Sequence, residues 1–246
     1  MDIRQYLDST YLKTADQAGV PEDRNRETAL ALVQEAIEEG FKLAMIRPEY
    51  VADAKHMVKE ANATVSIGTV IDFPNGTSPL EAKLAEAEKA VADGADELDY
   101  VCNYRAFLEG DEDLVRQEVL EGTRLGLEHL KVVKWIIEVA AMDLGEVARI
   151  SALIKSVVVT HFEGHYNEVF VKSSTGFFET TGGKPNGATM EAVVTMLENA
   201  APLPVKAAGG VRTYEDAAQM ISIGVKRIGT SAAKAIAHGG ASQNAY

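Results

Sequence analysis

Short runs of β-branched and apolar residues alternate with longer amphipathic stretches along the whole chain, and this alternation restricts the fold more than any other feature. The runs with strand character are 43–46, 64–71, 97–101, 132–137, 169–172, 205–207 and 227–229, with a weaker one at 6–8. The stretches with helical character are 27–39, 50–61, 80–92, 114–127, 144–154, 190–199, 214–223 and 232–237. A strand followed by a helix, repeated eight times, predicts a closed parallel α/β barrel of the (β/α)₈ TIM type.

The length favours one such barrel over two domains. The chain has 246 residues, of which 46% are hydrophobic, and a (β/α)₈ barrel takes about 250 residues. We therefore expect a single barrel domain over residues 1–246, ending in a flexible tail at 239–246. An open, doubly wound sheet is the alternative, but no Gly-x-Gly-x-x-Gly motif follows the first expected strand.

Several helix details follow from local patterns. The apolar face expected for the helix at 80–92 consists of Leu80, Leu84, Ala87 and Val91. The residues expected to cap helix N-termini are Ser78, Asp143 and Thr213. Residues 157–160 have strand propensity but lie where the fifth helix should finish, so we interpret them as a helix end or a loop.

The charge of the chain excludes some classes of partner. The formal net charge is −13, whereas nucleic-acid and anionic-membrane binding both need basic patches. The N-terminus has no apolar signal segment, and no run of 18 apolar residues occurs. The single cysteine, Cys102, cannot form an internal disulfide. We expect a cytoplasmic protein that binds neither nucleic acid nor membranes.

Two lysines carry the chemistry of this chain. Lys172 lies in Val-Phe-Val-Lys-Ser-Ser-Thr-Gly and Lys206 in Leu-Pro-Val-Lys-Ala-Ala-Gly-Gly, each at the C-terminal end of an expected strand. Parallel barrels place their active sites at these strand ends. Two ammonium groups in one pocket repel each other, so each loses its proton more easily and leaves an amine that can attack a carbonyl. The pair predicts an enzyme that forms a Schiff base.

Period-two alternation brings further charged side chains to the same end of the barrel. Every second residue of a barrel strand points inward, so Asp99, Lys134 and Glu138 are expected to share the barrel mouth with the two lysines. A carboxylate such as Asp99 can keep one lysine charged while another is neutral, and it can relay protons. A purely structural network of buried ion pairs is the alternative interpretation.

Two glycine-containing loops indicate a phosphate site. They are Ala-Ala-Gly-Gly-Val-Arg-Thr at 207–213 and Arg-Ile-Gly-Thr-Ser-Ala at 227–232. Loops after the seventh and eighth strands form the common phosphate site of barrel enzymes. Glycine lets the backbone approach a ligand, and a helix beginning near Ser231 would direct N–H groups at an anion. Ordinary glycine-rich turns are the alternative.

In their order along the chain, these segments resemble the deoxyribose-phosphate aldolase family, and the resemblance covers nearly the whole sequence. The matching segments are 7–10, 69–76, 94–99, 134–138, 171–177, 206–213 and 227–231. The resemblance implies a class I aldolase that reversibly cleaves 2-deoxy-D-ribose 5-phosphate to acetaldehyde and D-glyceraldehyde 3-phosphate. It also implies that no metal or other cofactor takes part.

The resemblance assigns roles to particular residues. Lys172 matches the Schiff-base lysine, and Lys206 matches the second lysine, which lowers the pKa of the first. Asp99 matches the aspartate of the proton relay, with Lys134 in the same network. The residues expected to bind substrate and phosphate are Asp8, Thr10, Leu12, Thr175, Gly176, Gly209, Gly210, Gly229 and Ser231. The terminal Tyr246 is a candidate lid over the site.

Other interpretations remain open at this point. They are a Schiff-base aldolase with another donor or acceptor, a phosphate-binding barrel isomerase without a covalent lysine, and a non-catalytic barrel. His161 and His165 can share a helix face, but they lack a recognisable metal motif, so no metal site is expected. Lys184, in a loop at 178–186 that is longer than the family often has, is either a mobile phosphate contact or a solvated residue. The expected partners are the phosphorylated sugar and its aldehydes, and the fold suits a homodimer or a larger homo-oligomer.

Overall fold

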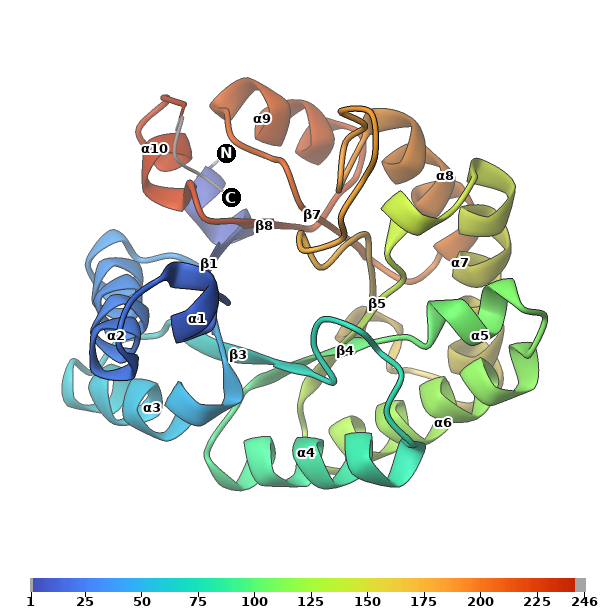
Figure 1. Ribbon diagram of the computed structural model, residues 1–246, viewed down its shortest axis with the longest axis horizontal. Helices are drawn as coiled ribbons and strands as arrows, with labels where there is room; N and C mark the ends of the chain where they lie inside the picture. The colour runs from blue at the N-terminus through green and yellow to red at the C-terminus, as the bar shows by residue number, and fades with distance from the viewer. Residues whose placement is uncertain (1, 242–246) are drawn as a thin grey trace.

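The computed structural model describes residues 2–241, and in this part of the chain eight parallel strands close into a barrel (Figure 1). Each strand pairs with the next one in chain order, and the last pairs with the first. The strands are β1 Leu7–Thr10, β2 Leu43–Ile46, β3 Ser66–Ile71, β4 Glu97–Val101, β5 Val132–Ile136, β6 Val169–Lys172, β7 Val205–Ala208 and β8 Arg227–Thr230. The predicted (β/α)₈ barrel is confirmed, and the open sheet is excluded because this sheet closes on itself.

Helices form a ring around the barrel (Figure 1). The α-helices are α1 Ala15–Ala18, α2 Glu22–Glu39, α3 Val51–Glu60, α4 Leu80–Ala92, α5 Tyr104–Leu108, α6 Glu112–Glu128, α7 Leu144–His161, α8 Met190–Ala200, α9 Tyr214–Ser222 and α10 Ala233–Ala237. The short 3₁₀ turns are η1 Ile3–Tyr6, η2 Pro48–Tyr50, η3 Val139–Ala141 and η4 Tyr166–Glu168. None of the helices within residues 2–241 is long and apolar enough to cross a bilayer.

Burial on both faces explains the composition of the strands. The strands β2, β4, β6, β7 and β8 are buried along their whole length. Their outward side chains join a core with the inner faces of the helices, in which Trp135 and Val171 meet residues such as Val119, Ile150 and Met196. Parallel strands covered in this way need apolar residues on the helix side. Only the inward parity is therefore free to carry charge.

Two predicted helix caps and one uncertain helix end are settled by the structure. The Asp143 side chain accepts from the backbone N–H of Glu146, whose carboxylate accepts from the N–H of Asp143, so a capping box starts α7. Thr213 caps α9 in the predicted way. Residues 157–160, interpreted from the sequence as a helix end or a loop, are helical, and α7 continues to His161. Packing of the buried side chains at 157 and 158 against the core outweighs their strand propensity.

The start and the buried face of α4 differ from the prediction. Ser78 does not cap the helix; its N–H and hydroxyl both donate to the Asp72 carboxylate instead. The residues of α4 that are buried are Lys83, Ala87 and Ala90, so the buried face is rotated from the apolar stripe. A lysine can occupy this face because its ammonium finds partners there, which the apolar pattern alone does not reveal.

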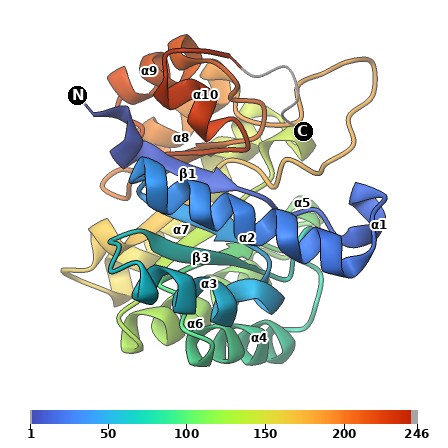
Figure 2. The ribbon, with the colours of Figure 1, turned by 90° about the vertical axis from the view of Figure 1, so that its left-hand side faces the viewer.

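The loops at the carboxyl ends of the strands carry structure that the sequence patterns missed. The short helices α1 and α5 follow β1 and β4, and α2 begins at Glu22, five residues before the expected 27. Figure 2 shows α1 and the orange loop between β6 and α8 projecting on the same side of the barrel. The described part of the expected tail, 239–241, lies against the start of α9, where Ala241 forms a bridge with Thr213. Tyr246 lies outside the described residues.

Strand register brings the charged residues together. Asp99 of β4 is the register partner of Lys134 of β5. Lys172 of β6 is the register partner of Lys206 of β7 in the same way. Since each pair occupies equivalent positions of adjacent strands, the two side chains of a pair point to the same face. The inward parity predicted from the sequence is confirmed for these four residues.

Candidate active site

Seven charged side chains meet inside the barrel, and all of them are buried. We call this group the barrel cluster. Its members are Asp8, Glu97, Asp99, Lys134, Lys172, Lys206 and Arg227. Buried charges persist only when they are paired, and here the pairing partners come from six different strands.

Asp99 is the centre of the barrel cluster. Its Oδ1 accepts from Lys134 Nζ at 2.6 Å, and its Oδ2 accepts from Lys172 Nζ at 2.8 Å and from Lys206 Nζ at 2.9 Å. Burial alone would raise the pKa of this carboxyl, but the three ammonium groups outweigh burial and hold the pKa well below its usual range. Asp99 is therefore a carboxylate that three lysines share.

Asp8 and Glu97, together with Asp99, compensate most of the positive charge of the barrel cluster. Asp8 Oδ2 lies 2.6 Å from Lys206 Nζ, and Asp8 Oδ1 accepts from Arg227 Nε at 2.7 Å. Arg227 also reaches both oxygens of Glu97, one of which lies 2.5 Å from Lys134 Nζ. Four cationic side chains thus face three carboxylates in the cluster as a whole. If every group were ionised, the cluster would carry one surplus positive charge.

Lys172 is the lysine from which that surplus is most easily released. Burial is the largest influence and lowers the pKa of Lys172 to about 8, with repulsion from Lys206 and Lys134 acting in the same direction and Asp99 opposing it. The repulsion between the two lysines predicted from the sequence acts with the expected sign, but burial is the stronger cause. A pKa of about 8 leaves about a tenth of the Lys172 amines neutral at pH 7.

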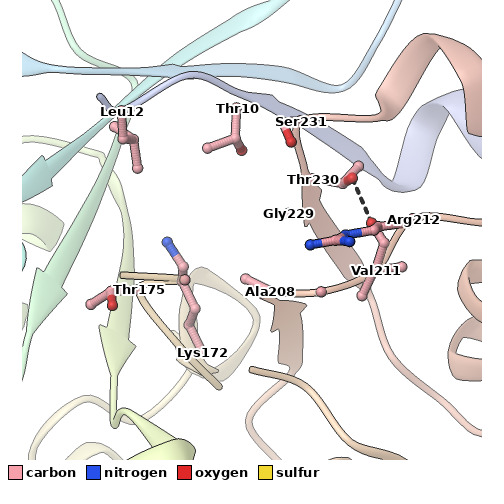
Figure 3. A pocket seen from close by; sticks show the side chains of 13 residues that line it. Thr10, Leu12, Lys172, Thr175, Ala208, Val211, Arg212, Gly229, Thr230 and Ser231 are labelled. Atoms are coloured by element: carbon pink, nitrogen blue, oxygen red, sulfur yellow. Dashed lines mark hydrogen bonds between the residues drawn. The ribbon is translucent and has the colours of Figure 1, made fainter. Parts of the chain in front are cut away.

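A pocket opens directly above Lys172 (Figure 3). The residues that line it are Thr10, Leu12, Lys172, Thr175, Gly176, Ala208, Gly209, Gly210, Val211, Arg212, Gly229, Thr230 and Ser231. Figure 3 shows Lys172 and Thr175 on one side of the pocket and Arg212, Thr230 and Ser231 on the other. The pocket thus has an amine end and a loop end. Asp8 lies beneath it, held by Lys206 and Arg227, and not among the residues that line it.

The loop end is built from the two glycine-containing loops. Gly209 has a left-handed φ of 87°, and a Cβ there would come within 2.8 Å of Gly187 Cα, so this turn requires glycine. Thr230 ties the loops together, since its hydroxyl donates to Val211 O at 2.7 Å. The helix after Ser231, α10, has only five residues. The loops themselves must therefore supply most of the N–H groups available to an anion.

Arg212 is a site residue that sequence reasoning did not single out. It is exposed, it lines the loop end of the pocket, and it makes no ion pair with a carboxylate of residues 2–241. The signal was present in the motif at 207–213, where arginine follows the glycine pair. An arginine beside glycine-rich loops can bind a phosphate through paired N–H donors. Lys184, by contrast, is exposed and does not line this pocket.

Glu138 occupies a separate place from the barrel cluster. It lies beyond the end of β5 with a left-handed φ of 59°, and its Oε2 accepts from both the N–H and the hydroxyl of Thr175. Burial raises the pKa of Glu138 to about 7, although the bonds from Thr175 and the charge of Lys172 act against burial. The residue was expected in the barrel mouth with the lysines, and the structure shows it bonded to the neighbouring loop instead.

The histidines of the sequence do not form a metal site in the described part of the chain. His161 is the last residue of α7 and His165 lies in the turn that follows, so the two do not share a helix face. Within residues 2–241, no three His, Cys, Asp or Glu side chains are arranged to hold a metal ion.

A (β/α)₈ barrel with buried lysines beneath a pocket is an arrangement typical of barrel aldolases, and comparison with known proteins gives the family. The sequence matches the DeoC/LacD family of aldolases over residues 6–242. It is 40% identical to the deoxyribose-phosphate aldolase of Thermococcus gammatolerans over 240 residues, covering 97% of this chain and 96% of that protein. It is 38% identical to that of Thermococcus kodakarensis over 239 residues, covering 97% and 96%. The chain therefore belongs to the DeoC/LacD family of aldolases, and the resemblance identified from the sequence is confirmed.

Solved structures support the same assignment. The aldolase QR15 superimposes with a TM-score of 0.81 at 31% identity, covering 97% of this chain and 95% of that one. A tetrameric deoxyribose phosphate aldolase from Aeropyrum pernix superimposes with a TM-score of 0.77 at 28% identity, covering 96% and 89%. The chain is an aldolase in fold and in sequence.

Proposed function

We propose that this chain is a class I aldolase that cleaves 2-deoxy-D-ribose 5-phosphate reversibly to acetaldehyde and D-glyceraldehyde 3-phosphate through a Schiff base on Lys172. The observation that carries the proposal is the environment of Lys172. This buried lysine has a pKa near 8, hydrogen-bonds to Asp99 and faces a pocket whose far end can receive a phosphate. The choice of substrate rests on the similarity of the chain to deoxyribose-phosphate aldolases.

Imine formation uses the neutral fraction of Lys172. The amine attacks the C1 aldehyde of the open-chain sugar, and the carbinolamine loses water to give an iminium ion. Lys206 and Lys134 disfavour a third ammonium charge at Lys172, which favours the neutral amine before attack. Asp99 accepts a hydrogen bond from the Lys172 nitrogen and so fixes its position.

The iminium ion then acts as an electron sink for cleavage of the C2–C3 bond. The C3 hydroxyl loses its proton, D-glyceraldehyde 3-phosphate leaves, and an enamine of acetaldehyde remains on Lys172. Protonation of the enamine carbon needs a group that exchanges protons with its neighbours. Asp99 and Lys206, which are joined at 2.9 Å, are suited to this relay, with Lys134 holding the other oxygen of Asp99. Hydrolysis of the new imine releases acetaldehyde.

The phosphate end is assigned to the loop end of the pocket. Arg212 supplies charge, and the turn at Gly209 and Gly210, with Gly229 of β8 opposite, lets the backbone approach the ligand. The residues proposed to complete the substrate site are Thr10, Leu12, Thr175, Gly176 and Ser231. Asp8 acts from below, because it orients Lys206 and does not line the pocket.

The experiment that tests this proposal is reductive trapping. The enzyme is treated with borohydride in the presence of 2-deoxyribose 5-phosphate, and the modified peptide is mapped by mass spectrometry. We expect a reduced adduct on Lys172 that is absent from Lys172→Ala. An adduct on Lys134 or Lys206 would transfer the nucleophile to that residue. A folded enzyme that turns over the sugar without any trapped adduct would support the isomerase-type alternative, which needs no covalent lysine.

Two further expectations stand beside this one. We expect the enzyme to work in the cytoplasm on small, diffusible substrates without any cofactor. We also expect a homo-oligomer, for which the tetrameric relative from Aeropyrum pernix is a precedent. Sedimentation of the full chain tests the assembly state.

A further inference from the structure

A buried acid outside the barrel cluster stands beside the amine end of the pocket. Glu138 is 1% exposed, and its backbone has the left-handed φ of 59° that non-glycine residues seldom adopt. Its Oε1 is buried and has no hydrogen-bond partner among residues 2–241. A buried, unsatisfied carboxyl oxygen on a strained backbone is costly. We therefore expect a function of Glu138 that differs from those of the barrel cluster.

The contacts of Glu138 fix the hydroxyl of Thr175. The Thr175 N–H donates to Glu138 Oε2 at 3.2 Å, and the Thr175 hydroxyl donates to the same oxygen. The Thr175 oxygen also accepts from the backbone N–H of Phe177 at 3.0 Å. A hydroxyl has one hydrogen and two lone pairs. With Glu138 ionised, Thr175 therefore keeps one lone pair, which can accept a hydrogen bond from a ligand.

Thr175 faces the same pocket as Lys172 (Figure 3). The sugar bound as an iminium ion at Lys172 would extend from this side toward Arg212. Its C3 hydroxyl is two carbon atoms from the imine carbon, so it belongs to the amine end of the pocket. Thr175 is the hydroxyl-bearing residue at that end. The other threonine and serine side chains lining the pocket are Thr10, Thr230 and Ser231.

A second pocket adjoins the first at Thr175 and reaches Glu138. Its walls include Tyr104, Arg105, Phe178 and Glu179, and both Glu138 and Thr175 line it. Glu138 does not line the first pocket, so the second pocket is the side from which we expect solvent protons to reach its carboxyl group.

The charges around Glu138 permit either protonation state near neutral pH. Lys172 lies on the barrel side, the Tyr104 hydroxyl and the Arg105 cation lie on the α5 side, and Glu179 lies across the second pocket. Burial raises the pKa of Glu138 to about 7, in spite of the Thr175 bonds and the charge of Lys172. A carboxylate with a pKa close to the working pH is suited to accept a proton and return it.

We propose that Thr175 and Glu138 form a proton relay that takes up the proton of the substrate C3 hydroxyl during carbon–carbon bond cleavage. The proposal deepens the proposed function and rests on it. Thr175 contacts the substrate, and Glu138 is a positioning and proton-storing residue that acts through Thr175. The barrel cluster around Asp99 keeps the separate task of protonating the enamine.

The step balances in atoms and charge. The C3 O–H bond breaks as its proton moves to Thr175 Oγ1, and the original Thr175 proton moves along its hydrogen bond to Glu138 Oε2. The C3 oxygen becomes a carbonyl, the C2–C3 bond breaks, and its electron pair forms the C1–C2 double bond of the enamine. The nitrogen of Lys172 changes from positively charged to neutral, and Glu138 changes from negatively charged to neutral. Opposite charges are thus neutralised together in a buried site, which avoids an isolated charge.

Two relays would make cleavage of the sugar and hydrogen exchange of acetaldehyde respond differently to substitution, whereas a single relay would make them respond together. Cleavage of 2-deoxyribose 5-phosphate needs the imine and removal of the C3 proton. Exchange of the methyl hydrogens of acetaldehyde with deuterium oxide needs the imine and the enamine but breaks no carbon–carbon bond. For Glu138→Gln we expect cleavage to fall by about 10²-fold, the lower part of the range for a lost acid–base group. We expect exchange and borohydride trapping to change by no more than a few-fold.

Thr175 variants give a second line of evidence that does not depend on the folding of Glu138→Gln. Thr175→Ser keeps the hydroxyl and should retain cleavage, whereas Thr175→Val should lose it to the same extent as Glu138→Gln. Because the two residues act as one relay, the double variant should be no slower than Glu138→Gln alone. The matched control is Glu118→Gln, which alters another buried acid that lines neither pocket and should leave the ratio of cleavage to exchange unchanged.

The pH profile provides the readout that a merely structural role would not give. In the natural enzyme, the ratio of cleavage to exchange should rise with pH through about 7, since the relay needs ionised Glu138. In Glu138→Gln that ratio should be independent of pH. Equal losses of cleavage and exchange in Glu138→Gln, or full cleavage in Thr175→Val, would overturn the relay. If borohydride trapped no adduct on the natural enzyme, that result would instead contradict the Schiff-base function itself.

Discussion

Two groups of lysines and carboxylates in this molecule differ in how many hydrogen-bond acceptors surround the lysine. The barrel cluster lies inside the barrel, beneath the pocket. A second group, which we call the outer cluster, lies between the barrel and its helices and consists of the buried Lys83 and Glu118 with the partly exposed Asp72. In the outer cluster the Lys83 ammonium donates to Gly76 O, Val101 O and Glu118 Oε1 at 2.7–3.0 Å. An ammonium has three N–H donors, and here all three are used.

Lys172 in the barrel cluster has the opposite arrangement. Among residues 2–241, its single hydrogen-bond acceptor is Asp99 Oδ2, which Lys206 also uses. The Lys83 ammonium thus has an acceptor for every donor, whereas removal of a proton from Lys172 relieves a surplus charge. The comparison teaches that burial alone does not activate a lysine. At Lys172, burial combined with too few acceptors lowers the pKa, whereas at Lys83 the full set of acceptors joins the loop at Gly76 and the end of β4 at Val101 to α6.

The largest expected effect tests the activation of Lys172. Replacement by methionine, Lys172→Met, should lower kcat on 2-deoxyribose 5-phosphate by on the order of 10⁴-fold or more, as expected when a covalent nucleophile is lost. Because Lys172 is the surplus cation of its cluster, the midpoint of urea unfolding should stay unchanged or rise. Steady-state kinetics and urea titration measure the two effects. A strongly destabilised Lys172→Met would show that its charge supports the fold, against the comparison.

The next effect tests the outer cluster with the same substitution. Lys83→Met leaves Glu118 buried without its cation and should lower the free energy of unfolding by about 3–5 kcal/mol. Borohydride trapping on Lys172 should persist below the unfolding transition, because the barrel cluster is untouched. The double variant Lys83→Met/Glu118→Leu should recover part of the lost stability. An unfolding midpoint equal to that of the natural protein would remove the distinction between the clusters.

A substitution at Asp99 sharpens the role of the shared carboxylate. Asp99→Asn should lower kcat by about 10²- to 10³-fold, since the proton relay loses its acceptor. The pKa of Lys172 should fall further, because Asp99 acts to raise it. The pH at which trapping reaches half its maximal rate therefore moves to lower values. Asp96→Asn, which alters a partly exposed aspartate paired with Lys55 outside the barrel, is the control and should keep the natural kcat.

The pH dependence of imine formation gives a test without mutation. The depressed pKa of Lys172, about 8, means that the reactive neutral amine increases as the pH rises through 8 and levels off above it. Between pH 6 and pH 9 the neutral fraction rises from about 1% to about 90%, so trapping at limiting acetaldehyde should accelerate about 90-fold. Continued acceleration up to pH 10.5 would mean that burial in the cluster does not lower this pKa.

The smallest effect concerns an exposed cation, for which solvent screening weakens every interaction. Arg212→Ala should raise KM for 2-deoxyribose 5-phosphate by about 10-fold, as expected for one charge-assisted hydrogen bond near water. Turnover of unphosphorylated 2-deoxyribose should not change. Lys184→Ala is the matched control, since Lys184 is exposed but does not line the pocket. An equal rise of KM in both variants would point to general charge attraction and not to a defined phosphate contact.

Much of the site was accessible from the sequence because it depends on two local features, the period-two alternation of the strands and the positions where the strands end. The period-two pattern of Glu97–Val101 places Asp99 on the inward face, and the strand ends place Lys172 and Lys206 at the barrel mouth. Arg212 was passed over because an arginine in a loop motif looks like any solvated cation. The buried position of Lys83 was missed because a helical stripe of apolar residues takes no account of carbonyl groups that another loop presents.

The sequence by itself determined the strand–helix alternation, the inward parity of the strands and the identity of the glycine turns, because these depend on neighbours a few residues apart. Only the tertiary structure decided which charges meet. Asp99 and Lys206 are 107 residues apart and Glu138 and Thr175 are 37 apart, and their contacts exist only after the barrel closes in one register. The pKa of Lys172 belongs to the same category. Burial and the sum of nearby charges set that pKa, and both quantities depend on distances in space that no local pattern contains.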